Sequence, residues 1–225
     1  KKEIQKYFDK PLSEITILVL GCGYRYPDVF LFSNVSNRTV GLDVEENFYR
    51  DGFLKFQFYN IKKLGLIRSS LLAYRRRKGV KNYYKILEDL SGESINHQDL
   101  EISSYDGKII PFEDNSFDAV ISTAVLEHVM DLDTFFSEAN RVTTPGGFSH
   151  HLYHNYYSFS GGHLSQNLCE ANPWGHLRGI YETDDNHLNK VRKKEVVETF
   201  SKFFEEVNMY STDKNHNKKG IDDDF

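Results

Sequence analysis

Hydrophobic residues occur along the chain in short runs separated by polar turns. ITILVL at 15–20 is continuous and β-branched, which is typical of a strand buried on both faces of a parallel sheet. FDAVIS at 117–122 predicts a second buried strand. Further strands are predicted over RTVGLDV at 38–44, the segment 98–103, GFSHHLYH at 147–154 and VNMYS from Val207.

Apolar residues spaced by three and four positions predict helices between these strands. Pro27 suits a first helical position, so a helix follows the turn after the first strand. Asp131 can cap a helix that places Phe135 and Phe136 on one face and that ends before TTPGG. A last helix is predicted over 196–204, with Val197, Phe200 and Phe204 on its apolar side.

Strands alternating with helices predict an α/β fold. The expected architecture is a Rossmann-like, doubly wound and mostly parallel sheet with helices on both faces. We expect one domain over 1–225, with a helical insertion at about 48–94 in which YYKILEDLSG ends at Gly92. The segment at about 154–190 follows the fifth predicted strand and is rich in aromatics, so we expect an acceptor-side lid there.

The loop GCGYRY at 21–26 follows the first predicted strand. It carries Gly21 and Gly23, but Tyr26 stands where a dinucleotide fingerprint needs its third glycine. Asp43, at the end of the second predicted strand, can accept hydrogen bonds from a ribose diol. Asp28 lies in the first helical turn, where it would repel a pyrophosphate. The loop therefore favours an adenosine without phosphates over NAD.

Which adenosine-containing ligand is expected depends on a longer segment, residues 106–147, with the sequence DGKIIPFEDNSFDAVISTAVLEHVMDLDTFFSEANRVTTPGG. Its order of Asp106, an Ile-Pro-Phe turn, Ser-Phe-Asp, a buried strand, Leu-Glu-His and Arg-Val-x-x-Pro-Gly-Gly resembles the class I S-adenosylmethionine-dependent methyltransferases of the small-molecule "type 11" group. The resemblance covers 15–153 apart from the insertion. It implies S-adenosylmethionine as cofactor, S-adenosylhomocysteine as product, and methyl transfer to a small-molecule or glycan-type acceptor.

By this resemblance, the glycine loop approaches the methionine portion of the cofactor, Asp43 holds the ribose, and the turn at 106–107 faces the adenine. Residues 122–123 would form the floor near the sulfonium. The implied cofactor-binding residues are Gly21, Cys22, Gly23, Asp43, Asp106, Gly107, Ser122 and Thr123. Val19 and Arg25 depart from the family pattern, in which an acid and a third glycine stand there. An alternative is thus a catalytically silent relative acting as an interaction or regulatory module.

A hydroxyl acceptor needs a proton acceptor, and histidine is the usual one near neutral pH. His128 follows the fourth strand and His154 the fifth, so these are the predicted catalytic bases. The predicted substrate-binding residues lie in the lid and are Tyr156, Tyr157, His163 and Trp174. His150 and His151 point to opposite faces of a strand and cannot share a metal ion, and we expect no metal site.

Charge and composition restrict the partners. The formal net charge of −5 argues against general nucleic-acid binding, although YRRRK at 74–78 is locally basic. No run is long and apolar enough to span a bilayer, and two cysteines do not build a disulfide framework, so we expect a cytoplasmic protein. The chain begins at Lys1, which suggests an excised domain, and 212–225 holds no convincing closing strand. The sequence leaves the oligomeric state open.

Overall fold

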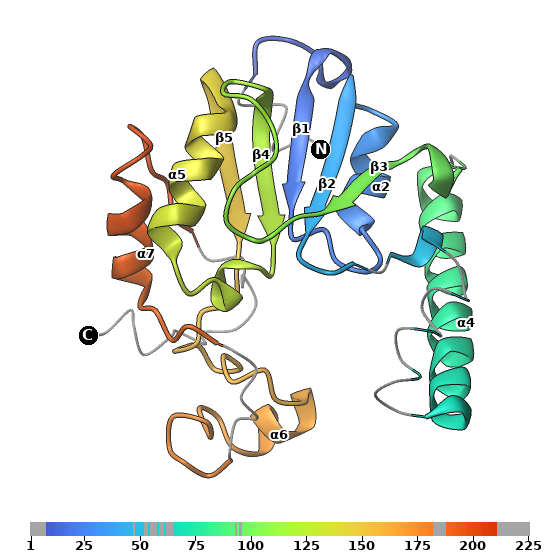
Figure 1. Ribbon diagram of the computed structural model, residues 1–225. Helices are drawn as coiled ribbons and strands as arrows, with labels where there is room; N and C mark the ends of the chain where they lie inside the picture. Colours follow the sequence, from blue (N-terminus) through green and yellow to red (C-terminus); the bar gives the residue numbers. More distant parts are fainter. Residues whose placement is uncertain are drawn as a thin grey trace.

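The computed structural model describes residues 8–46, 48–51, 54, 58, 61, 65–92, 94, 96–181 and 188–210. Five parallel strands form one sheet in the order β3-β2-β1-β4-β5. Helices cover both faces of this sheet, and all the strands point toward the same edge (Figure 1). The predicted α/β fold with a doubly wound parallel sheet is therefore confirmed.

The central strands are those predicted from continuous apolar runs. They are β1 (Thr16–Leu20), β2 (Arg38–Asp43) and β4 (Phe117–Thr123). In β1, Ile17, Leu18, Val19 and Leu20 are at most 1% exposed. Leu20 lies opposite Leu42 on one side and Ser122 on the other. The chain order reverses at β1, so the ends of β1 and β4 flank the crevice where such sheets bind ligands.

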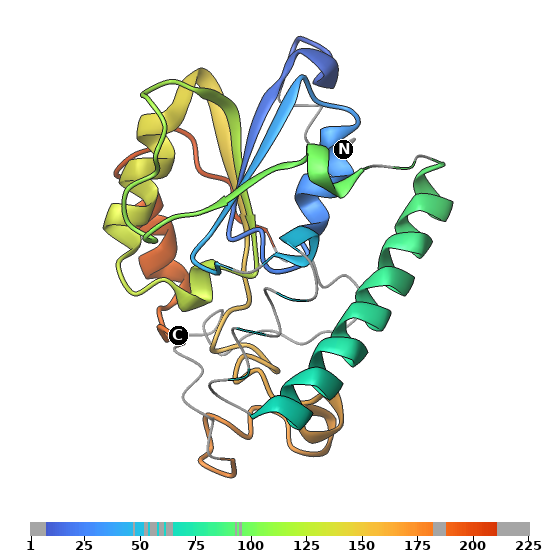
Figure 2. The ribbon, with the colours of Figure 1, turned by 45° about the vertical axis from the view of Figure 1, so that its right-hand side comes forward.

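Two helical layers enclose the sheet (Figures 1 and 2). On one face lie α5 (Leu132–Val142) and α7 (Lys193–Phe200), where Phe136 contacts Phe200 with ring centroids 4.9 Å apart. On the other face lies α2 (Pro27–Ser33), which begins at Pro27 as predicted. The two sides of the sheet thus bury separate cores: Ile17 and Val19 belong to one, and Leu18 and Leu20 to the other.

The cap predicted for α5 is present. Asp131 Oδ1 accepts a hydrogen bond from the amide of Thr134 at 3.0 Å, and the helix ends at Val142. The next strand, β5 (Thr143–Leu152), begins four residues before the predicted start at 147. Thr143 pairs with Phe117 of β4, and the next pair is Phe148 with Ala119, so the register shifts between these two pairs. Pro145 and the two glycines therefore lie within an irregular start of the strand.

Two other boundaries and one predicted strand differ from the prediction. The third strand, β3 (Glu101–Ser104), is shorter, because His97–Asp99 form a 3-10 turn whose N-cap is Asn96. The helix α7 begins at Lys193 and ends at Phe200, before the predicted 204. The sixth strand predicted at VNMYS is wrong, since residues 207–210 are irregular, and Ser211 and the tail from 212 lie outside the described residues.

A long helix, α4 (Leu66–Ser91), occupies the predicted insertion and ends with Gly92 in the left-handed conformation at φ 72°. It runs along the outside of the molecule beyond α2 (Figure 2). Val80 and Tyr84 bury their side chains in the core on that side. None of the described helices is long and apolar enough to cross a membrane.

Candidate functional site

The glycine loop lies at the carboxyl end of β1. Gly21 and Gly23 have positive φ angles of 64° and 70°, which favour glycine. A methyl group on Gly21 would overlap the side chain of Val125, whereas one on Gly23 would meet no atom. Gly21 thus permits close packing of two loops, and Gly23 leaves open space beside the loop.

Asp43 fixes this loop from the end of β2. It is 8% exposed, and its Oδ2 accepts a hydrogen bond from the amide of Gly23 at 2.6 Å. Its Oδ1 accepts from the amide of Glu45 at 2.8 Å. Each carboxylate oxygen keeps a further lone pair for a ligand donor. The predicted ribose-binding residue is therefore also the residue that orders the loop.

Cys22 lies between the two glycines and faces the protein. Its amide donates to the carbonyl of Leu42 at 3.1 Å, and its side chain is 5% exposed. Burial raises the pKa of the thiol, and the nearby Asp43 carboxylate raises it further. Cys22 therefore remains a protonated thiol, and its backbone is the part that can line a ligand site.

Tyr26 supports the loop from behind, a role that the sequence analysis did not assign. It is fully buried, has a φ of 42° and caps the start of α2. Its hydroxyl lies 3.2 Å from Nδ1 of His97, and its ring lies 5.9 Å from that of Tyr84 on α4. The aromatic side chain that excludes a dinucleotide fingerprint thus connects the loop to the helical insertion.

Asp106 and Gly107 form a turn after β3. Asp106 Oδ1 accepts from the amides of Lys108 and Ile109 at 2.8 and 3.0 Å, and these hydrogen bonds lower the pKa of its carboxyl. Gly107 has a φ of 76°, and a methyl group there would lie 2.9 Å from Val44. Tyr105 donates its amide to the carbonyl of Asp43 at 2.9 Å. The turn is therefore held beside the end of β2, and its role in facing the adenine stays a prediction.

The two residues predicted for the floor of the site differ in exposure. Thr123 is exposed at the end of β4, whereas Ser122 is 1% exposed. The hydroxyl of Ser122 lies 2.8 Å from Nδ1 of His151, and Nε2 of that ring lies 2.7 Å from the hydroxyl of Ser149. The Ser122 side chain is thus engaged within the sheet face that α5 covers, and only its backbone borders β1.

Four titratable residues gather beyond the ends of β4 and β5. His128 and Glu127 belong to a 3-10 turn, Leu126–His128, and His154 follows β5. His163 comes from the lid, and its ring is stacked on His154 at 4.9 Å and lies edge-on to His128 at 5.4 Å. The structure therefore brings together both predicted catalytic bases and one predicted substrate-binding residue.

Glu127 is the member of this group that sequence reasoning missed. It is 2% exposed, and burial raises the pKa of its carboxyl. Its Oε1 lies 3.8 Å from Nε2 of His163. Within the described part of the chain, these atoms and Oε2 make no hydrogen bond. The Leu-Glu-His motif at 126–128 contains this glutamate directly before the predicted base His128.

The lid packs through aromatic side chains. Tyr156 is 9% exposed, and its carbonyl lies 2.7 Å from Nε2 of His176. Tyr157 lies under the guanidinium of Arg192 at 4.6 Å. Trp174 contacts Phe159 with ring centroids 5.9 Å apart, and its indole nitrogen is buried. Of these side chains, predicted to bind substrate, Trp174 packs within the lid, whereas Tyr157 packs against Arg192 at the start of α7. Residues 182–187 of the predicted lid lie outside the described residues.

The turn that carries Glu127 is held by the last residues of the lid. Asn189 donates its side-chain amide to the carbonyls of Leu126 and Val129 at 2.6 and 2.8 Å. Its backbone amide donates to the carbonyl of Glu127 at 2.9 Å. At the start of the lid, Leu152 accepts from the amide of Ala124 at 2.7 Å. Both ends of the lid are thus bonded to the loop after β4.

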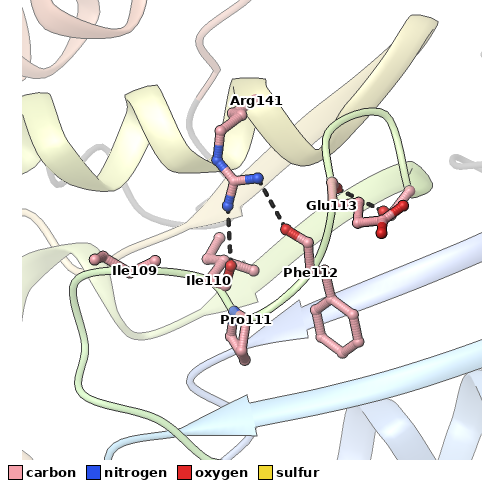
Figure 3. A pocket seen from close by; sticks show the side chains of 7 residues that line it. Ile109, Ile110, Pro111, Phe112, Glu113 and Arg141 are labelled. Carbon is pink, nitrogen blue, oxygen red and sulfur yellow. Dashed lines mark hydrogen bonds between the residues drawn. The ribbon is translucent and has the colours of Figure 1, made fainter.

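A shallow pocket lies elsewhere, along the segment 109–116 (Figure 3). Arg141 donates to the carbonyls of Ile110 and Phe112 at 2.9 and 2.8 Å and forms an ion pair with Glu138 at 2.7 Å. Because α5 ends at Val142, where β5 begins, Arg141 lies at the amino edge of the sheet. The residues that line this pocket include none of those predicted to bind the cofactor, although Ile109 is hydrogen-bonded to Asp106. Within the described ranges, no group of three or more acidic, histidine or cysteine side chains is arranged to hold a metal ion.

Comparison with known proteins gives one family match. Residues 71–150 match the family described as a methyltransferase domain. The chain is 46% identical over 52 residues to demethylmenaquinone methyltransferase of Streptomyces avermitilis, a segment that covers 23% of this chain and 22% of that protein. The chain thus spans about a fifth of the length of this curated relative.

Two solved structures are similar to this chain at low sequence identity. The YcgJ protein of a Bacillus species is 17% identical, covering 89% of this chain and 65% of that one, with a TM-score of 0.49. Phosphoethanolamine N-methyltransferase 2 of Haemonchus contortus, solved with S-adenosyl-L-methionine, is 17% identical, covering 90% of this chain and 35% of that one, with a TM-score of 0.48.

Proposed function

We infer that this chain belongs to the class I S-adenosylmethionine-dependent methyltransferases, because residues 71–150 match a methyltransferase domain and the sheet has the expected parallel order. This match confirms the resemblance identified from residues 106–147. We propose that the protein transfers the methyl group of S-adenosylmethionine to a small-molecule or glycan-type acceptor. The proposal deepens the family assignment by naming the residues that would act on each partner.

The residues around the glycine loop fit the cofactor. Asp43 is a buried carboxylate at the end of β2, and each of its oxygens can accept a further hydrogen bond, as two ribose hydroxyls require. The space beside Gly23 allows a ligand to approach the loop backbone. The turn at Asp106 and Gly107 borders Asp43 through Tyr105. We assign these residues, with Gly21, Cys22 and the ends of β4 at Ser122 and Thr123, to cofactor binding.

S-Adenosylmethionine supplies an activated methyl group on a sulfonium, so the protein need only align the acceptor and receive its proton. The histidines beyond β4 and β5 are suited to this second task. His128 and His154 remain the proposed catalytic bases, with His163 beside them. Tyr156, Tyr157 and Trp174 would surround the acceptor from the lid. A reducing compartment such as the cytoplasm is supported by two free, buried cysteines, Cys22 and Cys169.

The silent-domain alternative rests on Val19 and Arg25. Val19 is 1% exposed in the core of the sheet, and Arg25 is exposed with its guanidinium 5.8 Å from the ring of Tyr83 on α4. These substitutions leave the Asp43–Gly23 hydrogen bond intact, and this bond is the observation that carries the proposal of a working cofactor site.

Isothermal titration calorimetry with S-adenosylhomocysteine tests the proposal, because this product needs no acceptor to be known. We expect saturable one-site binding to the full chain, and no heat from NADH at the same concentrations. A folded sample that binds neither ligand would favour the silent module, and binding of NADH alone would contradict the methyltransferase assignment. If S-adenosylhomocysteine binds, its enzymatic release from S-adenosylmethionine can be followed across a panel of sugars, phenols and amines.

A further inference from the structure

The carboxylate of Glu127 and the imidazole of His163 face each other inside the site. Oε1 and Nε2 are 3.8 Å apart, slightly beyond a hydrogen bond. Both atoms are buried, and neither has a partner at hydrogen-bond distance within the described ranges. The backbone groups of Glu127 and His154 lie near this carboxyl and favour its ionised form. Leaving two such buried polar groups unpaired destabilises the fold. A small rotation of either side chain would pair them with each other.

The backbone also holds His163 in an unusual conformation. Its φ is 54°, in the left-handed region that is unfavourable for residues other than glycine. The stacked ring of His154 and the edge of His128 fix its imidazole from two sides. Strain of this kind persists where the surrounding structure determines it, and such residues cluster at functional sites.

The two nitrogens of His163 are not equivalent. Nε2 is buried toward Glu127, yet the side chain as a whole is 23% exposed, so other atoms of the ring account for its accessible surface. By contrast, Nε2 of His154 lies 2.8 Å from the hydroxyl of Ser160 and is already engaged. A carboxylate that accepts from one imidazole nitrogen fixes the tautomer and leaves the other nitrogen as the base.

We propose that Glu127 is a positioning residue that orients His163, and that Nδ1 of His163 receives the proton of the methyl acceptor. This rests on the proposed methyltransferase function and assigns the role of base to His163 in place of His128 and His154. In the transfer step, the acceptor atom forms a bond to the methyl carbon while the carbon–sulfur bond breaks and its electron pair stays on sulfur. The acceptor proton moves to Nδ1, and the Glu127 carboxylate stabilises the imidazolium. The acceptor is thus one that carries a proton on the methylated atom, such as a hydroxyl or an amine.

NMR titration of the histidine ring protons, with the full chain saturated by S-adenosylhomocysteine, tests this pairing without any acceptor. The charged or titratable groups around His163 are Glu127, His128 and His154. The signal of His163 is assigned by its loss in His163→Gln. In Glu127→Gln, we expect the acid dissociation constant of His163 to rise at least tenfold, because the carboxylate that favours the imidazolium is removed. Glu127→Asp, which keeps the charge, should restore much of this change.

Glu198→Gln is the matched control, since Glu198 is 62% exposed on α7 and pairs only with Lys194 among the described contacts. It should leave the His163 titration unchanged. An unchanged titration in folded Glu127→Gln would overturn the proposal. If that variant does not fold, the wild-type protein decides: His163 must bind its proton at a higher pH than His154, and the reverse order would overturn the pairing. Binding of S-adenosylhomocysteine is measured separately, so failure of the pairing and failure of the cofactor site are distinguishable.

Discussion

The carboxylate of Asp43 accepts a hydrogen bond from the amide of Gly23 at 2.6 Å, so the end of β2 and the turn after β1 form one unit. A ribose bound by Asp43 would therefore lie against a loop whose conformation the same carboxylate maintains. Under the proposed role of Asp43, cofactor affinity and loop order depend on the same side chain.

Asp43→Ala should weaken S-adenosylhomocysteine binding by about 1 to 3 kcal/mol, because the hydrogen bonds to a ribose and to the loop amide are lost together. Calorimetry measures this change. Asp133→Ala is the control, since Asp133 is 58% exposed and pairs with Lys202 at the surface. Equal affinity of the Asp43 variant and the wild type would remove Asp43 from the site.

Gly21→Ala should lower the free energy of unfolding by about 2 to 4 kcal/mol, combining a left-handed backbone with the overlap on Val125. Gly23→Ala has the same backbone cost without a clash and should lose only about 1 kcal/mol. Urea denaturation compares the two variants. Adding Val125→Ala to Gly21→Ala should recover part of the loss, and the absence of any recovery would show that the overlap is not its cause.

Arg141→Ala should destabilise the fold by about 2 to 3 kcal/mol, because two backbone carbonyls and the Glu138 carboxylate lose a charged donor. Arg141→Lys should recover little, since one ammonium cannot reproduce the planar set of donors. Arg38→Ala is the comparison: the Arg38–Glu101 pair is 42% and 51% exposed, so its loss should cost under about 1 kcal/mol. Similar losses for Arg38 and Arg141 would contradict this account.

His151 should make the fold sensitive to acid. Burial lowers the pKa of this imidazole to about 3, from an ordinary value of 6.5. Between these pH values the unfolded chain binds a proton that the folded chain does not, so stability falls as the pH drops below about 6.5, by at most about 1.4 kcal/mol per pH unit.

His151→Gln removes this contribution. Its free energy of unfolding should decline less than that of the wild type between neutral pH and about pH 4, as measured by urea denaturation at several pH values. His150, His154 and His163, whose pKa values are also lowered by burial, keep part of the slope in both proteins. Parallel stability curves for variant and wild type would show that His151 does not titrate as proposed.

Local patterns predicted the parts of the fold that depend on local chemistry. The apolar run before Gly21, the cap at Asp131 and the helix stop at Gly92 were each found where the residues indicated. The start of β5 was predicted after Pro145, at 147, although pairing of Thr143 with Phe117 begins the strand before this proline. The prediction of a sixth strand was wrong because a short apolar run does not specify which strand it would pair with.

In the candidate site, too, the contacts that follow from the order of the strands were predictable, and the contacts between distant side chains were not. The glycine loop and Asp43 belong to adjacent parallel strands, so their proximity followed from the predicted topology. The contacts of Ser122 with His151 and of Glu127 with His163 join segments 29 and 36 residues apart through side chains, and no local pattern encodes them. The assignments of His128 and His154 as bases stay predictions.

The chain is hydrogen-bonded to the loop after β4 both before the lid, where Leu152 pairs with Ala124, and at its end, through Asn189. The lid is therefore a loop whose two ends are held together. The entropy of closing such a loop grows only with the logarithm of its length, by about 0.6 kcal/mol for each doubling. Under the proposal that the lid surrounds the acceptor, insertions or deletions between the anchors would change which acceptor fits while barely changing the stability of the sheet. The two anchors would then separate the evolution of specificity from the maintenance of the fold.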